Sequence, residues 1–409
     1  MPSPLQLSIV AFNKGTYIIV EGKAQADLFY IIRTGKVKIT KEAELVQEDN
    51  VLGPGDFFGV VSSMSSHSHI ETAQALTDVS LIAVHRDQYD LLIEKNAPVA
   101  IKIIQGFARK MRFLDSAYTK LTLKNTAKED PSHLFNVGEH YARQNQYNLA
   151  YYAYYKFAKY CPTDPNVKTA KERLSKIQPY AKAVYLEGAE NQFARQYPKN
   201  TMIFSEAEPG NELFIIQKGR VRISKIVGEN EILIAVLKAN DIFGEMALLT
   251  NDARSASAIA HDDATLMVVN RSNFEKMVQT QPQLITKLTV ILANRIWLVY
   301  KQIANSTMAD PLGRLYDMLS IELEKNRVVI GPSQTYTFEV GPKELLTMVG
   351  LPAKEGTVLV NKLLENKKLK LADNRIFTAS TEEVVKQVEY FRKMEQIKKS
   401  RQAGSLSKG

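Results

Sequence analysis

The sequence lacks the residues and segments that support disulfide, thiolate or membrane chemistry. Its 409 residues include one cysteine, Cys161, so no disulfide can close within the chain. No histidine cluster lies near this cysteine in the sequence, and a thiolate metal site is not expected. No apolar run reaches the roughly 18 residues of a membrane span, and Met1 to Val10 has no basic stretch followed by an apolar core. We expect a cytoplasmic protein with no membrane partner.

Sequence patterns of enzymes are missing as well. The chain has no paired acids, nucleophile with a base, zinc-ligand spacing or Walker loop that withstands inspection. Gly53-Pro54-Gly55 and Glu206-Ala207-Glu208 are interpreted as turns. His67 and His69 form a His-x-His pair, which is a weak metal motif without further ligands. We therefore expect neither catalysis nor a metal cofactor.

The composition is that of a globular protein, and the net charge is positive. Hydrophobic residues make up 45% and charged residues 24%, near the averages of soluble proteins. The length allows about two to four domains, each with its own core. The net charge of +9 suits an anionic partner, nucleotide or nucleic acid, although it is also compatible with ordinary solubility.

An internal repeat dominates the organisation of the chain. Gly59 and Gly244 occupy equivalent positions 185 residues apart, and the same offset joins the helical residues Ala108 and Ala293. This constant offset predicts two copies of one fold. The repeated segments are 12–21 with 197–206, 28–39 with 212–223, and 55–59 with 240–244.

Each copy shows the pattern of several strands followed by a helix. Short alternating segments such as 37–40 and 221–224 are interrupted by glycines, which is typical of strands and turns. Each copy is therefore predicted to be an all-β roll. Apolar residues at helical spacing follow in 99–118 and 284–304, so we expect a helix after each roll.

Residues 131–177, between the two copies, predict a helical hairpin. The hairpin resembles one tetratricopeptide-type repeat, and because such repeats usually need about three units to be stable, we expect it to pack on a roll. Six tyrosines between Tyr147 and Tyr160 could stack on nucleic-acid bases. Packing within the hairpin is the favoured interpretation.

The chain changes character again after Asp310. The order of the predicted elements is typical of a winged helix-turn-helix, and an additional helix follows it. Ser380 and Glu383 stand at capping-box spacing at the start of that last helix. The predicted elements are a helix at 312–325, a strand at 336–340, helices on either side of Gly350, a hairpin at 369–378 and the last helix at 380–400.

The strongest chemical signal is the segment 243–257, Phe-Gly-Glu-Met-Ala-Leu-Leu-Thr-Asn-Asp-Ala-Arg-Ser-Ala-Ser. A guanidinium can meet the negative charge of a cyclic phosphodiester with paired donors. A glycine permits close backbone approach, and a short helix from Glu245 to Leu249 would direct free N–H groups at a phosphate. The segment resembles the phosphate-binding cassette of cyclic-nucleotide-binding domains, the family of bacterial catabolite-activator (Crp/Fnr-type) regulators and of kinase regulatory subunits.

The resemblance implies that the second roll binds a cyclic nucleotide, cAMP or cGMP. Glu245 would accept a hydrogen bond from the ribose 2′-hydroxyl, Arg254 would pair with the cyclic phosphate, and Ser255 would add a hydroxyl donor. A plain surface ion pair between Glu245 and Arg254 is the alternative. The implied ligand residues of the cassette are Phe243, Gly244, Glu245, Met246, Ala247, Arg254, Ser255 and Ala256.

The first copy has lost this charge pair. Without gaps, Val60 aligns with Glu245 and His69 aligns with Arg254. Because a neutral histidine cannot replace a guanidinium, we expect the first roll to be structural and not to bind a cyclic mononucleotide.

Base recognition depends on the helix after the second roll. In catabolite-activator regulators adjacent hydroxyl residues on this helix read adenine, and the ungapped match places Val299 and Tyr300 there. Tyr300 could supply one hydroxyl or stack on a purine, or both residues could pack the helix. The cassette is compatible with cAMP, while cGMP or another phosphodiester stays open.

The C-terminal region resembles the DNA-binding domain of the same regulators in residues 310–319 and 341–350. The guanine-reading arginines of the family are missing from its recognition helix, where Gly356 also lowers helix stability by about 1 kcal/mol relative to Ala. A regulator that binds double-stranded DNA and an adaptor whose winged domain binds protein are both open. Candidate DNA contacts are Lys354, Glu355, Thr357 and Asn361 for bases and Lys362 for phosphates, with a solvated helix face as the alternative.

The helices after both rolls carry apolar seams at intervals of three and four. Such a seam predicts a homodimer, and its presence in both copies also allows a pseudo-dimer within one chain. We expect the ligand to tighten the cassette against the helix at 284–304 and so to reorient the winged domain. The seam residues are Ile104, Phe107, Met111 and Leu114 in one helix and Ile285, Leu288, Leu292, Ile296, Val299 and Ile303 in the other.

The sequence therefore predicts a multidomain α+β protein. Its expected parts are a β-roll with a degenerate cassette at 1–120, a helical linker at 121–185, a β-roll with a complete cassette at 186–308, a winged helix-turn-helix at 309–380, and a C-terminal helix with a basic tail at 381–409.

Overall fold

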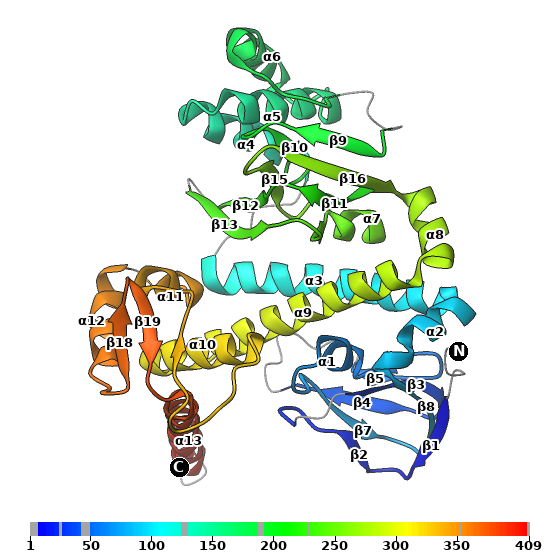
Figure 1. Cartoon of the computed structure of the whole chain (residues 1–409), viewed down its shortest axis with the longest axis vertical. Helices are drawn as coiled ribbons and strands as arrows, with labels where there is room; N and C mark the ends of the chain where they lie inside the picture. The colour runs from blue at the N-terminus through cyan, green and yellow to red at the C-terminus, as the bar shows by residue number, and fades with distance from the viewer. Residues whose placement is uncertain are drawn as a thin grey trace. The chain divides into compact units, whose positions relative to one another are not determined.

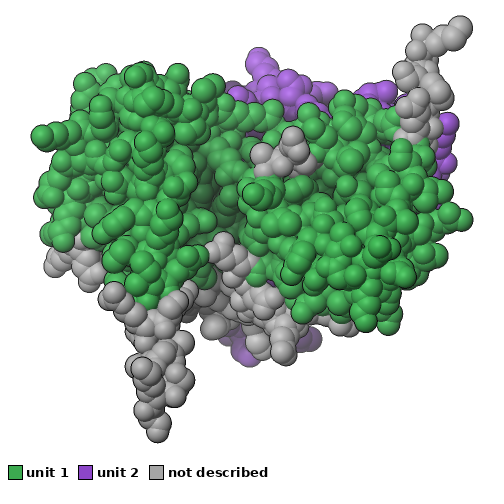
Figure 2. All heavy atoms as spheres, turned by 90° about the horizontal axis from the view of Figure 1, so that it is seen from below, with its two compact units in different colours: residues 1–88, 114–124, 293–409 green, residues 89–113, 125–292 purple. Residues whose placement is uncertain are grey.

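The computed structural model describes residues 7–23, 27–41, 50–123, 130–186, 192–227, 230–351 and 353–406. The chain forms two compact units, which have different colours in Figure 2. Unit 1 contains residues 1–88, 114–124 and 293–409, and unit 2 contains residues 89–113 and 125–292. The long helix after each roll contributes to both units, because a unit boundary falls inside each of these helices.

The first roll lies in unit 1 and pairs its strands in two antiparallel sheets, ordered β1-β8-β3-β6 and β2-β7-β4-β5. Alternate side chains such as Ile32, Val37 and Leu81 are buried between the sheets, because successive residues of a strand point to opposite faces. Its elements are β1 Ser8–Phe12, β2 Tyr17–Ile19, β3 Leu28–Thr34, β4 Val37–Thr40, β5 Val51–Leu52, β6 Phe57–Phe58, α1 Val60–Ser65, β7 Thr72–Ala75 and β8 Val79–His85, followed by η1 Arg86–Gln88, α2 Tyr89–Lys95 and α3 Ala97–Leu123.

The second roll, in unit 2, repeats this topology strand for strand, with sheets ordered β14-β11-β16-β9 and β10-β15-β12-β13. The prediction of two copies of one roll is therefore confirmed. Its elements are β9 Ala194–Tyr197, β10 Met202–Phe204, β11 Glu212–Lys218, β12 Val221–Val227, β13 Asn230–Leu237, β14 Ile242–Phe243, α7 Glu245–Thr250, β15 Ser257–Ala260, β16 Ala264–Asn270, α8 Arg271–Thr280 and α9 Pro282–Ser306.

The linker between the rolls folds as helices α4 His133–Arg143, α5 Tyr147–Tyr160 and α6 Val167–Ile177, followed by η2 Gln178–Tyr180, and Figure 1 draws the helices beside the second roll. A Cβ atom at Gly138 would lie 2.6 Å from the Tyr154 ring, so this glycine lets α4 approach α5. Tyr152 and Tyr154 are buried in a cluster that also includes Met202 and Ile259 of the roll. Packing of these aromatic residues is confirmed, and the tetratricopeptide assignment stays a prediction.

The C-terminal region of unit 1 has its helices and strands in the predicted order. Asp310 caps the first helix, because its Oδ1 accepts hydrogen bonds from the amides of Leu312 and Gly313. The strands form a sheet ordered β17-β19-β18. The identification as a winged helix-turn-helix stays a prediction. The elements are α10 Pro311–Lys325, β17 Tyr336–Thr337, α11 Pro342–Met348, α12 Ala353–Leu364, β18 Leu369–Ala372, β19 Arg375–Thr378 and α13 Thr381–Leu406.

Close packing between helices explains why a glycine stands at position 356, although glycine has a low helix propensity. A Cβ atom at this position would lie 2.4 Å from Cδ1 of Leu346, so the absence of a side chain lets α12 approach α11. The cost of glycine in a helix is therefore offset by close helix packing.

A search for membrane spans across the described residues finds no helix that is both long enough and apolar enough to cross a bilayer.

Candidate ligand site

The predicted cassette begins where β14 ends and α7 starts. Gly244 has φ of 76° and precedes the first residue of α7, a left-handed conformation that favours glycine. A Cβ atom at Gly244 would lie 2.9 Å from Nη1 of Arg254, and one at Gly210 would lie 2.3 Å from its Nε. Two glycines thus leave the space that the arginine side chain occupies.

Arg254 is only 4% exposed, although it carries a full positive charge. Its Nη1 donates a hydrogen bond to the carbonyl oxygen of Gly244 at 2.5 Å, and its Cζ lies 4.1 Å from the centre of the Phe204 ring. Within the part of the chain that the structure describes, its buried Nε has no hydrogen-bond partner. Burial lowers the pKa of Arg254, while the carboxylates of Glu208 and Glu212 act in the opposite direction.

The acids around Arg254 pair with other cations. Glu208 forms an ion pair with Lys156 at 3.0 Å, and Glu212 forms one with Arg195 at 2.6 Å. Glu245 is also buried, with 1% exposure, so the interpretation of Glu245 and Arg254 as a surface ion pair is wrong. A buried charge is costly unless it is paired and hydrogen-bonded. An anionic ligand beside Arg254 would supply the missing acceptors.

Aromatic rings form the apolar side of the cassette. Phe243 stacks on Phe214 with 5.3 Å between ring centres and lies 5.8 Å from Phe204. Phe204 and Phe214 are not among the residues predicted from the sequence; the copy of Phe214 in the first roll, Tyr30, is the signal that could have indicated it, and it stacks on Phe58 in the same way. Of the other predicted cassette residues, Met246 and Ala247 are buried, whereas Ser255 and Ala256 are partly exposed.

The turn at 206–208 contributes to the site in a way that the sequence did not indicate. The amide of Arg254 donates to the carbonyl of Glu208, and the amide of Ala207 donates to the carbonyl of Arg254, both at 2.8 Å. The Glu208 side chain is 7% exposed and accepts a hydrogen bond from the Tyr152 hydroxyl at 3.0 Å. The linker helix α5 therefore contacts the turn that pairs with the predicted phosphate-binding residue.

The helix after the first roll also reaches the cassette of the second roll. Within unit 2, Nη2 of Arg112 on α3 donates to the carbonyl of Ala253 at 2.6 Å, and its Nε lies 3.3 Å from a carboxylate oxygen of Asp252. In Figure 1 the first part of α3 passes below α7. Arg112 was not predicted to be a site residue.

Val299 and Tyr300, the predicted base-reading residues, belong to unit 1 rather than to the unit that contains the cassette. Both are buried, and the Tyr300 hydroxyl donates to Glu21 of the first roll at 2.8 Å. Trp297, one turn earlier, stacks on His67 of the same roll with 4.0 Å between ring centres. Within unit 1, this part of α9 therefore packs against the first roll.

In the first roll, the segment equivalent to the cassette makes hydrogen bonds with other residues of the same chain. The amide of Gly59, the equivalent of Gly244, donates to the carboxylate of Glu71 at 2.9 Å. The hydroxyl of Ser68 donates to Glu324 of α10 at 2.6 Å. Arg327, just after α10, donates to the carbonyl of Ser65 at 3.2 Å.

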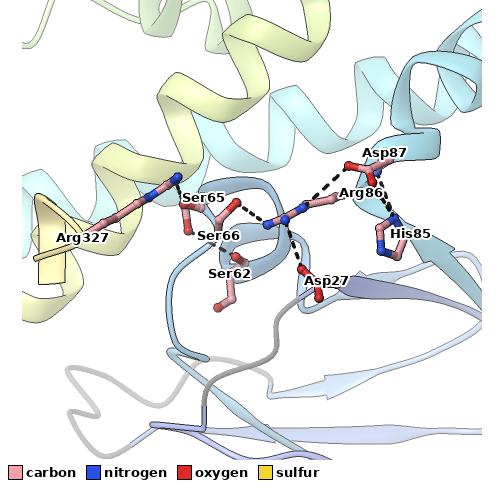
Figure 3. A network of polar contacts seen from close by, with 8 residues as sticks. All are labelled: Asp27, Ser62, Ser65, Ser66, His85, Arg86, Asp87 and Arg327. Atoms are coloured by element: carbon pink, nitrogen blue, oxygen red, sulfur yellow. Dashed lines mark hydrogen bonds and ion pairs between the residues drawn. The ribbon is translucent and has the colours of Figure 1, made fainter. Parts of the chain in front are cut away.

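Figure 3 shows the same segment from close by. Arg86 donates to the hydroxyl of Ser66 and lies 3.3 Å from a carboxylate oxygen of Asp27. Intrachain contacts thus surround the short helix α1, which supports the expected structural role of the first roll.

The candidate DNA contacts lie on α12 in unit 1. Thr357, Asn361 and Lys362 are exposed, as is the apolar residue Val358 at 59%. The side chains of Lys354 and Glu355 lie outside the described residues. A search of the described residues finds no group of three or more His, Cys, Asp or Glu that could hold a metal ion.

Comparisons with known proteins identify both rolls. The family model of the cyclic nucleotide-binding domain matches residues 9–96 and 194–281. The cyclic AMP receptor protein of Thermus thermophilus is 29% identical over 164 residues, covering 40% of this chain and 70% of that protein. The human cGMP-dependent protein kinase 2 is 35% identical over 101 residues, which cover 24% of this chain and 13% of the kinase.

Among solved structures, that of a CooA mutant from Carboxydothermus hydrogenoformans matches with a TM-score of 0.38 and 20% identity, over 48% of this chain and 87% of that chain. The two matches to the domain model coincide with the two rolls. Both rolls therefore match the cyclic nucleotide-binding domain, and part of the chain is similar to a cyclic AMP receptor protein.

Proposed function

We propose that the protein is a transcription regulator that responds to a cyclic nucleotide, with cAMP favoured and cGMP as the alternative, bound in the second roll. The observation that carries this proposal is the buried guanidinium of Arg254. Its Nε finds no hydrogen-bond partner among the described residues, and two neighbouring acids, Glu208 and Glu212, pair with other cations. A cyclic phosphate carries one negative charge on two free oxygens, which a guanidinium can meet with paired donors.

In this proposal each contact with the nucleotide is assigned to a residue. Arg254 binds the cyclic phosphate, Ser255 donates a hydroxyl to it, and the buried Glu245 accepts the ribose 2′-hydroxyl. Gly244 keeps the backbone close to the ligand. The roles of Val299 and Tyr300 in base recognition stay predictions, because both residues belong to unit 1.

The output is assigned to the C-terminal region, as a winged helix-turn-helix that binds double-stranded DNA. The second helix of the proposed helix-turn-helix is α12, on which Thr357, Asn361 and Lys362 are exposed. These side chains can donate or accept hydrogen bonds at base edges and phosphates. The exposed Val358 could contact a thymine methyl group in the major groove. The same apolar residue would suit a protein partner, which is the adaptor alternative.

Calorimetric titration of the full chain with cAMP, cGMP and cyclic dinucleotides tests the ligand proposal. We expect one site per chain for one of these ligands, lost in Arg254→Ala. The matched control is His69→Ala, because His69 holds the equivalent position in the first roll. Absence of binding by the wild type, or equal binding by Arg254→Ala, would reject the second roll as a ligand site.

A gel-shift titration with genomic DNA fragments, with and without the bound nucleotide, tests the output. Binding to DNA should weaken as salt rises, because Lys and Arg release counterions from phosphates. Lys362→Ala should reduce both the affinity and the salt dependence. A chain that binds nucleotide but no DNA at any salt concentration would favour the adaptor.

A further inference from the structure

The segment that carries Arg254 is held on one side by a helix that does not belong to its own roll. Arg112 of α3 donates to the carbonyl of Ala253, the residue directly before Arg254, and lies 3.3 Å from Asp252. The Arg112 side chain is 19% exposed, and Asp252 is 51% exposed. The contact to the carbonyl and the contact to the carboxylate come from different nitrogens of one planar group, so the guanidinium constrains two neighbouring residues together.

The internal repeat produces the corresponding contact in unit 1. The offset of 185 residues maps Arg112 onto Trp297 and Asp252 onto His67. Trp297 and His67 are also in contact, stacked with 4.0 Å between ring centres. In each unit, therefore, this position of the helix from one copy contacts this position of the cassette from the other copy. The contact is an ion pair with a hydrogen bond in one unit and an aromatic stack in the other.

The turn at 206–208 also holds this segment. The backbone of Arg254 exchanges hydrogen bonds with Glu208 and Ala207, and the Glu208 carboxylate is fixed by Tyr152 and Lys156 of α5. Arg112 adds a contact to the two residues directly before Arg254, Asp252 and Ala253.

We propose that Arg112, on the helix after the first roll, is a positioning residue for Arg254 in the ligand site of the second roll. The inference rests on the proposed function in naming the ligand, but its structural part does not depend on a ligand. Through Ala253 and Asp252, Arg112 sets the backbone from which the guanidinium of Arg254 extends. The ligand site is thus built from both copies within one chain.

Hydrogen exchange of the ligand-free full chain tests the structural part. Arg112→Gln keeps a polar, although shorter, side chain. It removes the positive charge and the paired N–H donors of the guanidinium. We expect the amide of Arg254 to exchange about tenfold faster in this variant. Arg109→Gln, an exposed arginine on the same helix, is the matched control and should exchange like the wild type. Wild-type exchange in Arg112→Gln would overturn the proposal even if no nucleotide binds.

Calorimetry with the cyclic nucleotide that binds the wild type tests the positioning role. Arg112→Gln should raise the dissociation constant about tenfold without changing the number of sites, and Arg112→Lys, which can still pair with Asp252, should restore part of the affinity. If Arg112 acts through Arg254, Arg112→Gln should have little further effect in an Arg254→Lys background, because the two losses are then not independent.

The outcomes separate the two proposals. A wild type that binds no cyclic nucleotide rejects the proposed function and leaves the exchange result to decide on Arg112. Binding by the wild type with unchanged affinity in Arg112→Gln rejects the positioning role alone. If the fold losses of nucleotide affinity in the two single variants multiply in the double variant, the two residues act independently. Arg112 would then act by a route that does not involve Arg254.

Discussion

A buried guanidinium needs more acceptors than Arg254 finds among the described residues. One of its nitrogens donates to a carbonyl and another has no partner, while a phenylalanine ring covers its face. Such an arrangement stores a desolvation cost that a bound anion can relieve. At the residue scale, the affinity for ligand therefore depends on groups that keep this side chain in place, and the neighbouring glycines are among them.

Gly210→Ala should weaken nucleotide binding. The added Cβ would lie within 2.3 Å of Nε and 2.4 Å of Cζ of Arg254, so the buried guanidinium has to move. Overpacking of this kind typically costs about 1–3 kcal/mol, which corresponds to a loss of affinity of about fivefold or more. Calorimetry measures the effect. Gly331→Ala is the control, because its Cβ would make an ordinary contact at 3.6 Å; equal affinity of both variants would contradict the prediction.

His67 should make the stability of unit 1 depend on pH. Burial lowers the pKa of His67 from its ordinary value of 6.5, Glu324 opposes this shift, and Arg327 and Lys301 reinforce it. The unfolded chain then binds a proton that the folded chain does not, so the free energy of unfolding should fall as pH decreases through 6.5. Denaturant unfolding between about pH 8 and about pH 5 measures this slope, and His67→Gln should flatten it. A slope that is the same in the variant would exclude His67 as its source.

At the scale of elements, α3 combines two contacts that belong to different units. Arg112 reaches the cassette in unit 2, and in unit 1 the hydroxyl of Tyr118 donates to the carbonyl of Met348 at 3.0 Å. Met348 ends α11, directly before the turn to α12. The two residues of α3 are about 9 Å apart along the helix axis at the usual rise per residue. We propose that α3, besides the helix at 284–304, is an element that transmits ligand binding.

Tyr118→Phe should weaken the coupling between nucleotide and DNA binding. The variant loses a hydrogen bond of about 0.5–1.5 kcal/mol, which is comparable to a typical coupling free energy of about 1–3 kcal/mol. We expect unchanged nucleotide affinity in the absence of DNA, and a smaller change of DNA affinity on adding nucleotide. Parallel titrations with Tyr180→Phe, a tyrosine that is 70% exposed, give the control. Coupling at the wild-type level would argue against transmission through α3.

At the scale of the whole molecule, one chain buries the apolar seams that predicted dimerisation. Every seam residue of both helices, from Ile104 to Leu114 and from Ile285 to Ile303, is buried within the single chain. A second copy is therefore not needed to cover these residues. The intramolecular pseudo-dimer is the proposal that this burial supports, in place of the homodimer.

Light scattering should accordingly give a mass near 46.0 kDa, that of one chain, with and without nucleotide. The physical reason is that a buried seam offers no apolar surface to a partner helix. A mass of two chains at micromolar concentration would contradict this prediction and restore the homodimer.

The sequence by itself determined the two rolls, their helices, the order of the C-terminal elements and the cassette with Arg254. These features are local: they depend on alternation, glycine positions and an offset of 185 residues, all of which are visible along the chain. Its division into five parts and its cytoplasmic location stay predictions.

Only the tertiary structure decided which helix contacts which roll. The repeat alone assigns each helix to the roll before it, whereas Arg112 contacts the cassette of the second roll and Trp297 contacts the first. Likewise, the turn at Glu208 became part of the site only through its contacts with α5 and with the backbone of Arg254. Contacts between residues more than a hundred positions apart depend on how packed elements meet, and the pattern of a single segment contains no information about its partner.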